Sequence, residues 1–166
     1  MTTPGSPSDI HELLAASELT EVRIWEERAR RLHEARDDAH PGEPELHITT
    51  AIASADGALH YRFRVLVDDH AARYVADIES VYALDGFVPE AVPEELRREF
   101  AEKVAFMATY AHARASILGS AGRLGLRAIV MPLVRLGEFK VGDPLPREKV
   151  QAMLADDAED EAPGSD

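Results

Sequence analysis

The sequence alternates between apolar and polar residues from Leu46 to Tyr82, and the pair Asp56-Gly57 divides this stretch in two. An Asp-Gly pair between alternating segments is a strong signal for a two-residue hairpin turn. A turn at this position makes one face of the hairpin mostly apolar. The pairs on that face are Leu46 with Val67, Ile48 with Val65, Thr50 with Phe63, Ile52 with Tyr61, and Ser54 with Leu59. A slip of one residue would move all of these side chains to the other face, so the register is well determined.

A second turn is predicted around residues 69–72, and it adds a third antiparallel strand. Keeping the apolar faces together pairs Val67 with Tyr74, Val65 with Ala76, Phe63 with Ile78, and Leu59 with Tyr82. On the other face, the same register pairs Arg64 with Asp77, Arg62 with Glu79, and Asp68 with Arg73. Opposite charges across a strand pair favour that pairing. The stretch predicts an antiparallel meander with one buried face and one solvated face.

A long helix is predicted over residues 92–126, because apolar residues recur there at intervals of three and four. Pro93 suits the first helical position, and Glu94 and Glu95 suit the dipole of the first turn. The apolar face comprises Leu96, Phe100, Val104, Met107, Ala111 and Leu118, with Arg114 at the same spacing. A second stripe has small residues and one histidine: Ala101, Ala105, Ala108, His112, Ala115 and Gly119. Two such faces indicate two partners, a sheet and a second subunit. The alternative is that both faces pack within one chain.

The other segments complete the predicted domain organisation. Residues 1–17 predict a flexible leader and a short helix with Ser8 as its cap, and residues 18–35 fit a helix slightly better than a strand. Residues 85–93 predict a loop whose Phe87 and Val88 either tuck under the sheet or contact a partner. One domain is therefore expected over residues 18–136. An extension with a short helix is expected over 137–155, and a disordered acidic tail over 156–166.

Composition argues against several classes of function. The 166 residues carry a net charge of −13, whereas nucleic-acid binding depends on clusters of Lys and Arg. The absence of cysteine excludes disulfides and thiolate chemistry. We expect a cytoplasmic protein, because no apolar run is long enough for a membrane span and no signal-peptide pattern is present. The predicted register keeps His47 and His60 apart, so neither a metal site nor a cofactor is expected, and an enzyme is the weaker class.

Three segments resemble the SecB-type export chaperones, and especially the SecB-like chaperones associated with toxin–antitoxin systems of actinobacteria. Residues 21–24 (Glu-Val-Arg-Ile) resemble the family's first strand, and residues 73–78 (Arg-Tyr-Val-Ala-Asp-Ile) its fourth. Within residues 106–134, Tyr110 to Arg114 match an aromatic-Pro-Tyr-x-Arg helix segment, and Gly122 to Leu126 match a Gly-containing hinge. The resemblance implies an α+β fold, a four-stranded antiparallel sheet with one long helix. It also implies that residues 19–31 form a strand.

The resemblance further implies an ATP-independent holdase, which binds unfolded polypeptides for export or one dedicated client such as an antitoxin. The candidate client-binding residues are Tyr82, Leu84, Phe87, Val88 and Leu124. The implied assembly is a homotetramer, a dimer of dimers formed through sheet edges and helices. Its candidate interface residues are Ala101, Ala105, Ala108, His112 and Ala115. The alternatives are a scaffold module that lacks general client binding and a small-ligand or enzymatic domain.

In the export chaperones, an acidic and apolar patch on the sheet docks the tail of the translocase ATPase. Glu21, Val75 and Asp77 match that patch by position, but Trp25 stands where the family has a further acidic residue. Two other departures lie in and after the helix: Ala111 replaces a family proline, and Arg127-Ala128 replaces prolines of the toxin-linked relatives. These differences make docking of the translocase a weaker expectation than client binding.

Overall fold

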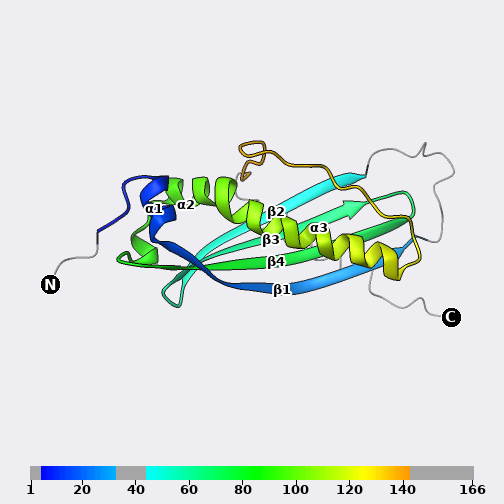
Figure 1. The fold of residues 1–166 in the computed structure, drawn as a ribbon, viewed down its shortest axis with the longest axis horizontal. Helices are drawn as coiled ribbons and strands as arrows, with labels where there is room; N and C mark the ends of the chain where they lie inside the picture. Colours follow the sequence, from blue (N-terminus) through cyan, green and yellow to red (C-terminus); the bar gives the residue numbers. More distant parts are fainter. Residues whose placement is uncertain (1–4, 33–43, 143–166) are drawn as a thin grey trace, which may run out of the picture.

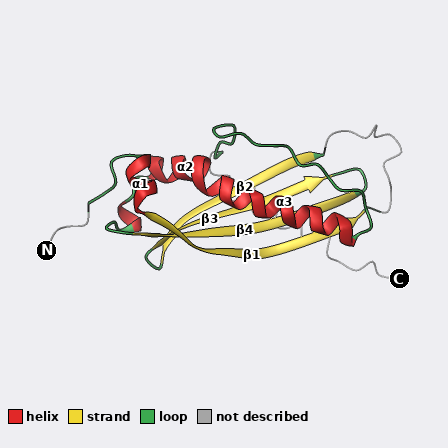
Figure 2. Cartoon of the chain, in the orientation of Figure 1, coloured by secondary structure: helices red, strands yellow, loops and turns green. Residues whose placement is uncertain are grey.

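The structure is a computed structural model that describes residues 5–32 and 44–142. A four-stranded sheet is crossed on one face by a long helix (Figures 1 and 2). The elements before the long helix are α1 (Ile10–Ala16), β1 (Ser17–Arg31), β2 (Glu45–Ala55), β3 (Ala58–Asp68), β4 (Ala72–Leu84) and the 3₁₀ turn η1 (Pro89–Ala91). The helix consists of α2 (Glu94–Phe100), the π-helical stretch η2 (Ala101–Ala105) and α3 (Phe106–Arg123). The predicted α+β fold is confirmed.

The sheet has the order β1-β4-β3-β2, and every neighbouring pair is antiparallel. All the strand pairs predicted for β2, β3 and β4 are present, from Leu46 opposite Val67 to Leu59 opposite Tyr82. Asp56 and Gly57 both have positive φ, 53° and 74°, as a two-residue hairpin turn of this type requires. The Asp-Gly turn and the alternation of apolar and polar residues therefore predicted the register of β2, β3 and β4 correctly.

β1 is a strand over all of residues 17–31, so the slight preference of the local pattern for a helix is wrong and the implied strand is correct. The register with β4 shifts twice, between Leu19 and Glu21 and between Ile24 and Glu26. Each β-bulge moves the following side chains to the other face and breaks the period-two pattern. The helix α1, which precedes β1, has Asp9 as its N-cap rather than Ser8. The Asp9 carboxylate accepts hydrogen bonds from the backbone amides of His11 and Glu12.

The π-helical stretch η2 changes which residues of the long helix face the sheet. Hydrogen bonds to the fifth residue back accommodate one extra residue, so every later side chain is displaced around the axis. Beyond η2, the buried side chains belong to Phe106, Thr109, Tyr110, Ala113, Ile117, Ser120 and Ala121. The predicted apolar face is wrong here, because Met107, Ala111 and Leu118 are exposed. At the start of the long helix, Pro93 is the N-cap of α2 and not its first helical residue, as was predicted.

The chain turns at Gly125, which has a φ of 65°, and then runs back along the β2 side of the helix (Figure 1). We call residues 126–142, which lack regular secondary structure, the C-terminal strap. The predicted short helix within residues 146–155 and the acidic tail of residues 156–166 lie outside the described residues. In the described part of the chain, no helix is long and apolar enough to cross a membrane.

Candidate functional site

The C-terminal strap packs some of its side chains against the core and leaves others exposed. Ile129 and Val134 pack against the core, and Met131 is buried. Val130 and Leu133 point the other way, with 85% and 77% of their surface exposed. Because the strap has no regular secondary structure, its position depends on side-chain packing and on a few polar contacts.

Phe139 joins the strap to an aromatic cluster beneath it. Its ring stacks on Phe106 with a centroid distance of 3.9 Å and an interplanar angle of 12°. It also meets Phe63 of β3 edge-on at 5.9 Å, and Phe106 stacks on Tyr110 at 5.1 Å. Aromatic pairs of these kinds add to the energy of burial alone. Phe139 therefore fills an aromatic site that β3 and the long helix form together.

Polar groups of the helix hold the strap at two points. The Tyr110 hydroxyl donates to the carbonyl of Pro132 at 2.9 Å. Glu102 accepts hydrogen bonds from the Lys140 ammonium and from the backbone amide of Val141, both at 2.9 Å. Desolvation raises the pKa of Glu102, but these hydrogen bonds and the charges of Lys140 and Arg98 outweigh it, so the pKa lies below its usual value. Two of the three contacts are to the backbone and do not depend on the strap's side chains.

The Glu102 contact predicts a pH-dependent contribution to stability. A carboxylate whose pKa is lowered by folding stabilises the folded state above its unfolded pKa and stops doing so as pH falls through its folded pKa. We expect Glu102→Gln to lower the free energy of unfolding by about 1 kcal/mol at neutral pH. The difference from wild type should be complete above the usual pKa of a glutamate, and should shrink as pH falls from there through the lowered pKa of folded Glu102, which denaturant titrations at a series of pH values would measure. A difference that is the same at all pH values would contradict this role.

The outer face of the sheet, which was predicted to be solvated but is buried along much of β4, carries a network of paired charges around Asp77. Asp77 is 2% exposed and accepts two hydrogen bonds from Arg62, both at 2.7 Å, and Arg64 approaches its other side at 3.4 Å. The bond to Asp77 raises the pKa of Arg62. Arg62 lies directly opposite Glu79, so the actual ion pair is diagonal to the predicted one. Of the three predicted ion pairs on this face, two are present: Asp68–Arg73 at 2.7 Å and Arg64–Asp77 at 3.4 Å.

Trp25 covers this network, a role that the sequence pattern did not reveal. Its ring lies 4.7 Å from the Arg62 guanidinium carbon, and its Nε1 donates to Glu79 at 3.0 Å. His60 also contacts Glu79, at 3.0 Å. In the predicted docking patch, Val75 and Asp77 are buried, and Glu21, though exposed, pairs with Arg23 at 2.6 Å. The acidic groups of this patch are thus matched by arginines of the same chain.

Removing Arg62 would leave a buried carboxylate without its main partner. We expect Arg62→Ala to destabilise the protein by about 2–3 kcal/mol, because an uncompensated buried charge costs more than a lost surface pair. The double variant Arg62→Ala/Asp77→Asn should recover a large part of that loss, since it removes the charge as well. Denaturant titration of the single and double variants measures both values. A double variant that is less stable than Arg62→Ala would rule out this explanation.

The predicted client-binding residues do not converge on one surface. Tyr82 is buried in the core between sheet and helix, with its ring 5.0 Å from that of Phe100. Leu124 follows the end of α3, about 45 Å of helix away from the start of α2. Three remain near one another in sequence: Leu84 and Phe87 are half-buried, and Val88 is exposed. They lie in or beside the loop between β4 and α2.

The predicted interface residues on the helix divide into two groups. Ala101 and Ala105 are fully buried in the core, so a second subunit cannot reach them, and that part of the prediction is wrong. The π-helical stretch accounts for this division. Ala101 and Ala105 lie within it, and the side chains that follow it are rotated around the helix axis relative to a regular α-helix. Ala108 is half-buried, and His112 and Ala115 are exposed. We call the surface of α3 that carries them the outer helix face; its members are Met107, Ala108, Ala111, His112, Ala115, Leu118 and Gly119.

The outer edge of β1 is a second exposed surface. β1 has 15 residues and pairs only with β4, so its other edge lies free in the described part of the chain. Leu19, Ile24 and Trp25 are each more than 40% exposed along it. A long edge strand with exposed apolar side chains is a template for pairing with another chain. The sequence signal for this edge was weak because the two bulges obscure its alternation.

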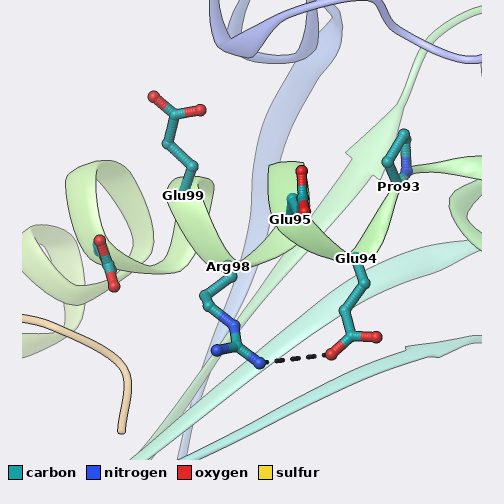
Figure 3. Close-up of a pocket in the computed structure, with 6 residues that line it drawn as sticks. Pro93, Glu94, Glu95, Arg98 and Glu99 are labelled. Carbon is teal, nitrogen blue, oxygen red and sulfur yellow. Dashed lines mark hydrogen bonds and ion pairs between the residues drawn. The ribbon is translucent and has the colours of Figure 1, made fainter. Parts of the chain in front are cut away.

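A shallow depression of about 590 Å³ lies along α2 (Figure 3). It is lined by Pro93, Glu94, Glu95, Arg98, Glu99 and Glu102. Three of its carboxylates already have partners: Glu94 pairs with Arg98, Glu99 with Lys103, and Glu102 with Lys140. Among the described residues, no group of three metal-ligating side chains is placed to hold an ion. The carboxylates of Glu94, Glu99 and Glu102 in this depression are thus paired with basic residues of the same chain.

The fold is an α+β fold with two exposed apolar surfaces, the outer helix face and the edge of β1. SmegB, a SecB-like chaperone of Mycolicibacterium smegmatis, is 36% identical over 143 residues, which are 85% of this chain and 92% of that protein. A solved SecB-like chaperone of Mycobacterium tuberculosis, Rv1957, in complex with a ChAD peptide from the antitoxin HigA1, matches with a TM-score of 0.61. This chain and Rv1957 are 14% identical, and the match covers 74% of this chain and 93% of the Rv1957 chain. No family model matches. The chain belongs to the SecB-like chaperone family.

Proposed function

We propose that this protein is an ATP-independent holdase that keeps one dedicated client, such as an antitoxin, from aggregating in the cytoplasm. The observation that carries this proposal is the 36% identity to a SecB-like chaperone over nearly the whole of both chains. The fold match to a SecB-like chaperone in complex with an antitoxin peptide supports the choice of client. The extended strap on the core supports the mode of binding. Export clients are the second candidate.

The client-binding surface that we propose includes Leu84, Phe87 and Val88 in and beside the β4–α2 loop. Phe87 and Val88 are apolar residues on a loop, and Val88 is exposed. Their place at the junction of sheet and helix suits contact with an extended apolar segment. Docking of the translocase ATPase is less favoured, because Asp77 is buried and paired with Arg62. An enzymatic function is not proposed.

We also propose that the protein assembles as a homotetramer through the outer helix face and the edge of β1. Leu118 is 50% exposed near the C-terminal end of the outer helix face, beside small residues that let another backbone approach closely. The strap adds Val130, Leu133 and Leu136, all strongly exposed. Exposed apolar residues grouped in this way are typical of interaction surfaces. Burial of these two surfaces would remove the free strand edge from solvent.

Suppression of aggregation tests the proposed activity. Insulin is a suitable probe because its B chain aggregates after reduction, and the reductant cannot affect a chaperone that has no cysteine. We expect stoichiometric amounts of the protein to suppress the light scattering of the aggregating B chain. Phe87→Asp should weaken the protection about tenfold, through the loss of apolar contact, whereas Glu90→Ala should not change it. A folded protein that gives no protection would refute the holdase activity.

A further inference from the structure

Arg97 of α2 places a positive charge against the core, and no carboxylate pairs with it in the described part of the chain. The residue is half-buried, and its Nη1 donates to the Ser54 hydroxyl at 3.2 Å. Its Nε is buried and has no hydrogen-bond partner among residues 5–32 and 44–142. The neighbouring Arg98, in contrast, pairs with Glu94. Because burial of a charge without a counter-charge is costly, the surroundings of Arg97 favour an anion.

The hydroxyl of Tyr61 is a second group without a partner at this place. Tyr61 is fully buried, and its hydroxyl has no hydrogen-bond partner within the described residues. Phe100, which follows Arg97 by one helical turn, stacks on the Tyr61 ring at 5.4 Å, so this ring lies beneath α2. Burial raises the pKa of Tyr61, and the charge of Arg97 opposes that rise, so guanidinium and hydroxyl are close enough to interact. Both groups are able to donate to one acceptor.

Ser54 fixes the guanidinium of Arg97 at this position. Its hydroxyl accepts from Arg97 and donates to the carbonyl of Pro89 in η1 at 3.3 Å. Ser54 lies near the end of β2 and Tyr61 near the start of β3, so the turn at residues 56–57 sets their relative positions. The two unpartnered donors are therefore held by regular structure, one from the helix and one from the hairpin.

We propose that Arg97 and Tyr61 bind a small monovalent inorganic anion, such as chloride, between α2 and the β2–β3 hairpin. The Nε of Arg97 and the hydroxyl of Tyr61 donate to the ion, and the guanidinium supplies the opposite charge. A small ion suits the place because both donor atoms are buried. The bound ion ties the long helix to the hairpin and stabilises the folded subunit. This inference is independent of the proposed holdase function.

Thermal unfolding in sodium chloride and in sodium gluconate, at one ionic strength and one protein concentration, tests this site. Gluconate is too large for it, so we expect the midpoint of wild type to rise with the chloride fraction along a saturable curve. Tyr61→Phe keeps the ring that stacks on Phe100 and removes one donor. We expect it to need about tenfold more chloride for half of the rise. Arg97→Gln should abolish the saturable rise, whereas Arg98→Gln, the matched control, should keep it.

Crystals grown in sodium bromide locate the ion directly, because bromide replaces chloride and scatters X-rays anomalously. We expect an anomalous peak between the Nε of Arg97 and the hydroxyl of Tyr61 in wild type, and none there in Arg97→Gln. If Arg97→Gln does not fold, Tyr61→Phe alone decides the thermal test. A folded Tyr61→Phe with the chloride response of wild type would overturn the proposal. So would bromide crystals of wild type without a peak at this place, in which case water is the partner of the two donors.

Discussion

Replacing Phe100 by alanine is expected to lower the free energy of unfolding by about 3–5 kcal/mol. Phe100 is fully buried at the end of α2 and stacks on Tyr61 with a ring separation of 5.4 Å. Its edge also meets Tyr82 at 5.0 Å. The shorter side chain would lose these contacts and leave a cavity between helix and sheet, where neither layer can collapse without moving. A loss of this size is a large part of the total stability of a typical domain.

Urea titration measures this effect. The protein concentration is kept fixed, because assembly makes stability depend on concentration. Leu14→Ala is the matched control, since it also shortens an apolar side chain, but at an exposed position of α1 outside the proposed assembly surfaces. It should change the stability by less than about 0.5 kcal/mol. If Phe100→Ala cost as little as the control, Phe100 would not be part of the core that joins helix to sheet.

Leu118→Asp is expected to reduce the assembled protein to smaller species while each subunit stays folded. Leu118 lies on the outer helix face, which the subunit itself leaves exposed. Each copy would bring a carboxylate into an apolar contact, and burying an unpaired charge costs several kcal/mol. A cost of about 4 kcal/mol weakens an association constant roughly a thousandfold. The proposed assembly through this face would therefore be lost at micromolar concentration.

Light scattering coupled to size exclusion measures the mass of this variant, and circular dichroism confirms that the subunit remains folded. Ala91→Asp provides the control, because it introduces the same charge at an exposed residue of η1, outside the outer helix face. The control should keep the mass of wild type. If Leu118→Asp also kept that mass, the helices would not form the interface.

The register of β2, β3 and β4 could be predicted to single-residue accuracy because its signals are local. Asp56-Gly57 determines one turn, and a one-residue slip at that turn would expose Phe63 and Val65. The register also predicted that arginines and carboxylates face one another on the outer face of the sheet. Arg62, however, pairs diagonally with Asp77 and not directly across the strands with Glu79. A long flexible side chain chooses among several carboxylates within its reach, and strand register does not decide which one.

The long helix shows where sequence pattern alone was insufficient. Its extent was predicted, but hydrophobic spacing assumes a constant 3.6 residues per turn, and η2 departs from that spacing at Ala101. The prediction therefore assigned Met107 and Leu118 to the buried face, although both are exposed. The same shift divided the predicted interface, since Ala105 is in the core and His112 is not.

Two parts of the candidate site had no local signal. β1 is held in place by pairing with β4, and its bulges remove the alternation that identifies a strand. The strap consists of an apolar stretch followed by a short irregular one, and no periodicity indicates that Phe139 stacks on Phe106. Such a contact depends on where the helix and sheet place the aromatic site. Sequence therefore identified the family and the class of function better than it identified the binding surface.

The central claim is that this chain captures unfolded polypeptide without ATP. The most direct measurement is the mass, by multi-angle light scattering after size exclusion, of the protein mixed with reduced and carboxymethylated α-lactalbumin in buffer without nucleotide. We predict one peak that contains both chains and whose mass equals that of the assembled protein plus bound polypeptide. Two separate peaks with unchanged masses, from a protein that is folded and assembled, would contradict the claim.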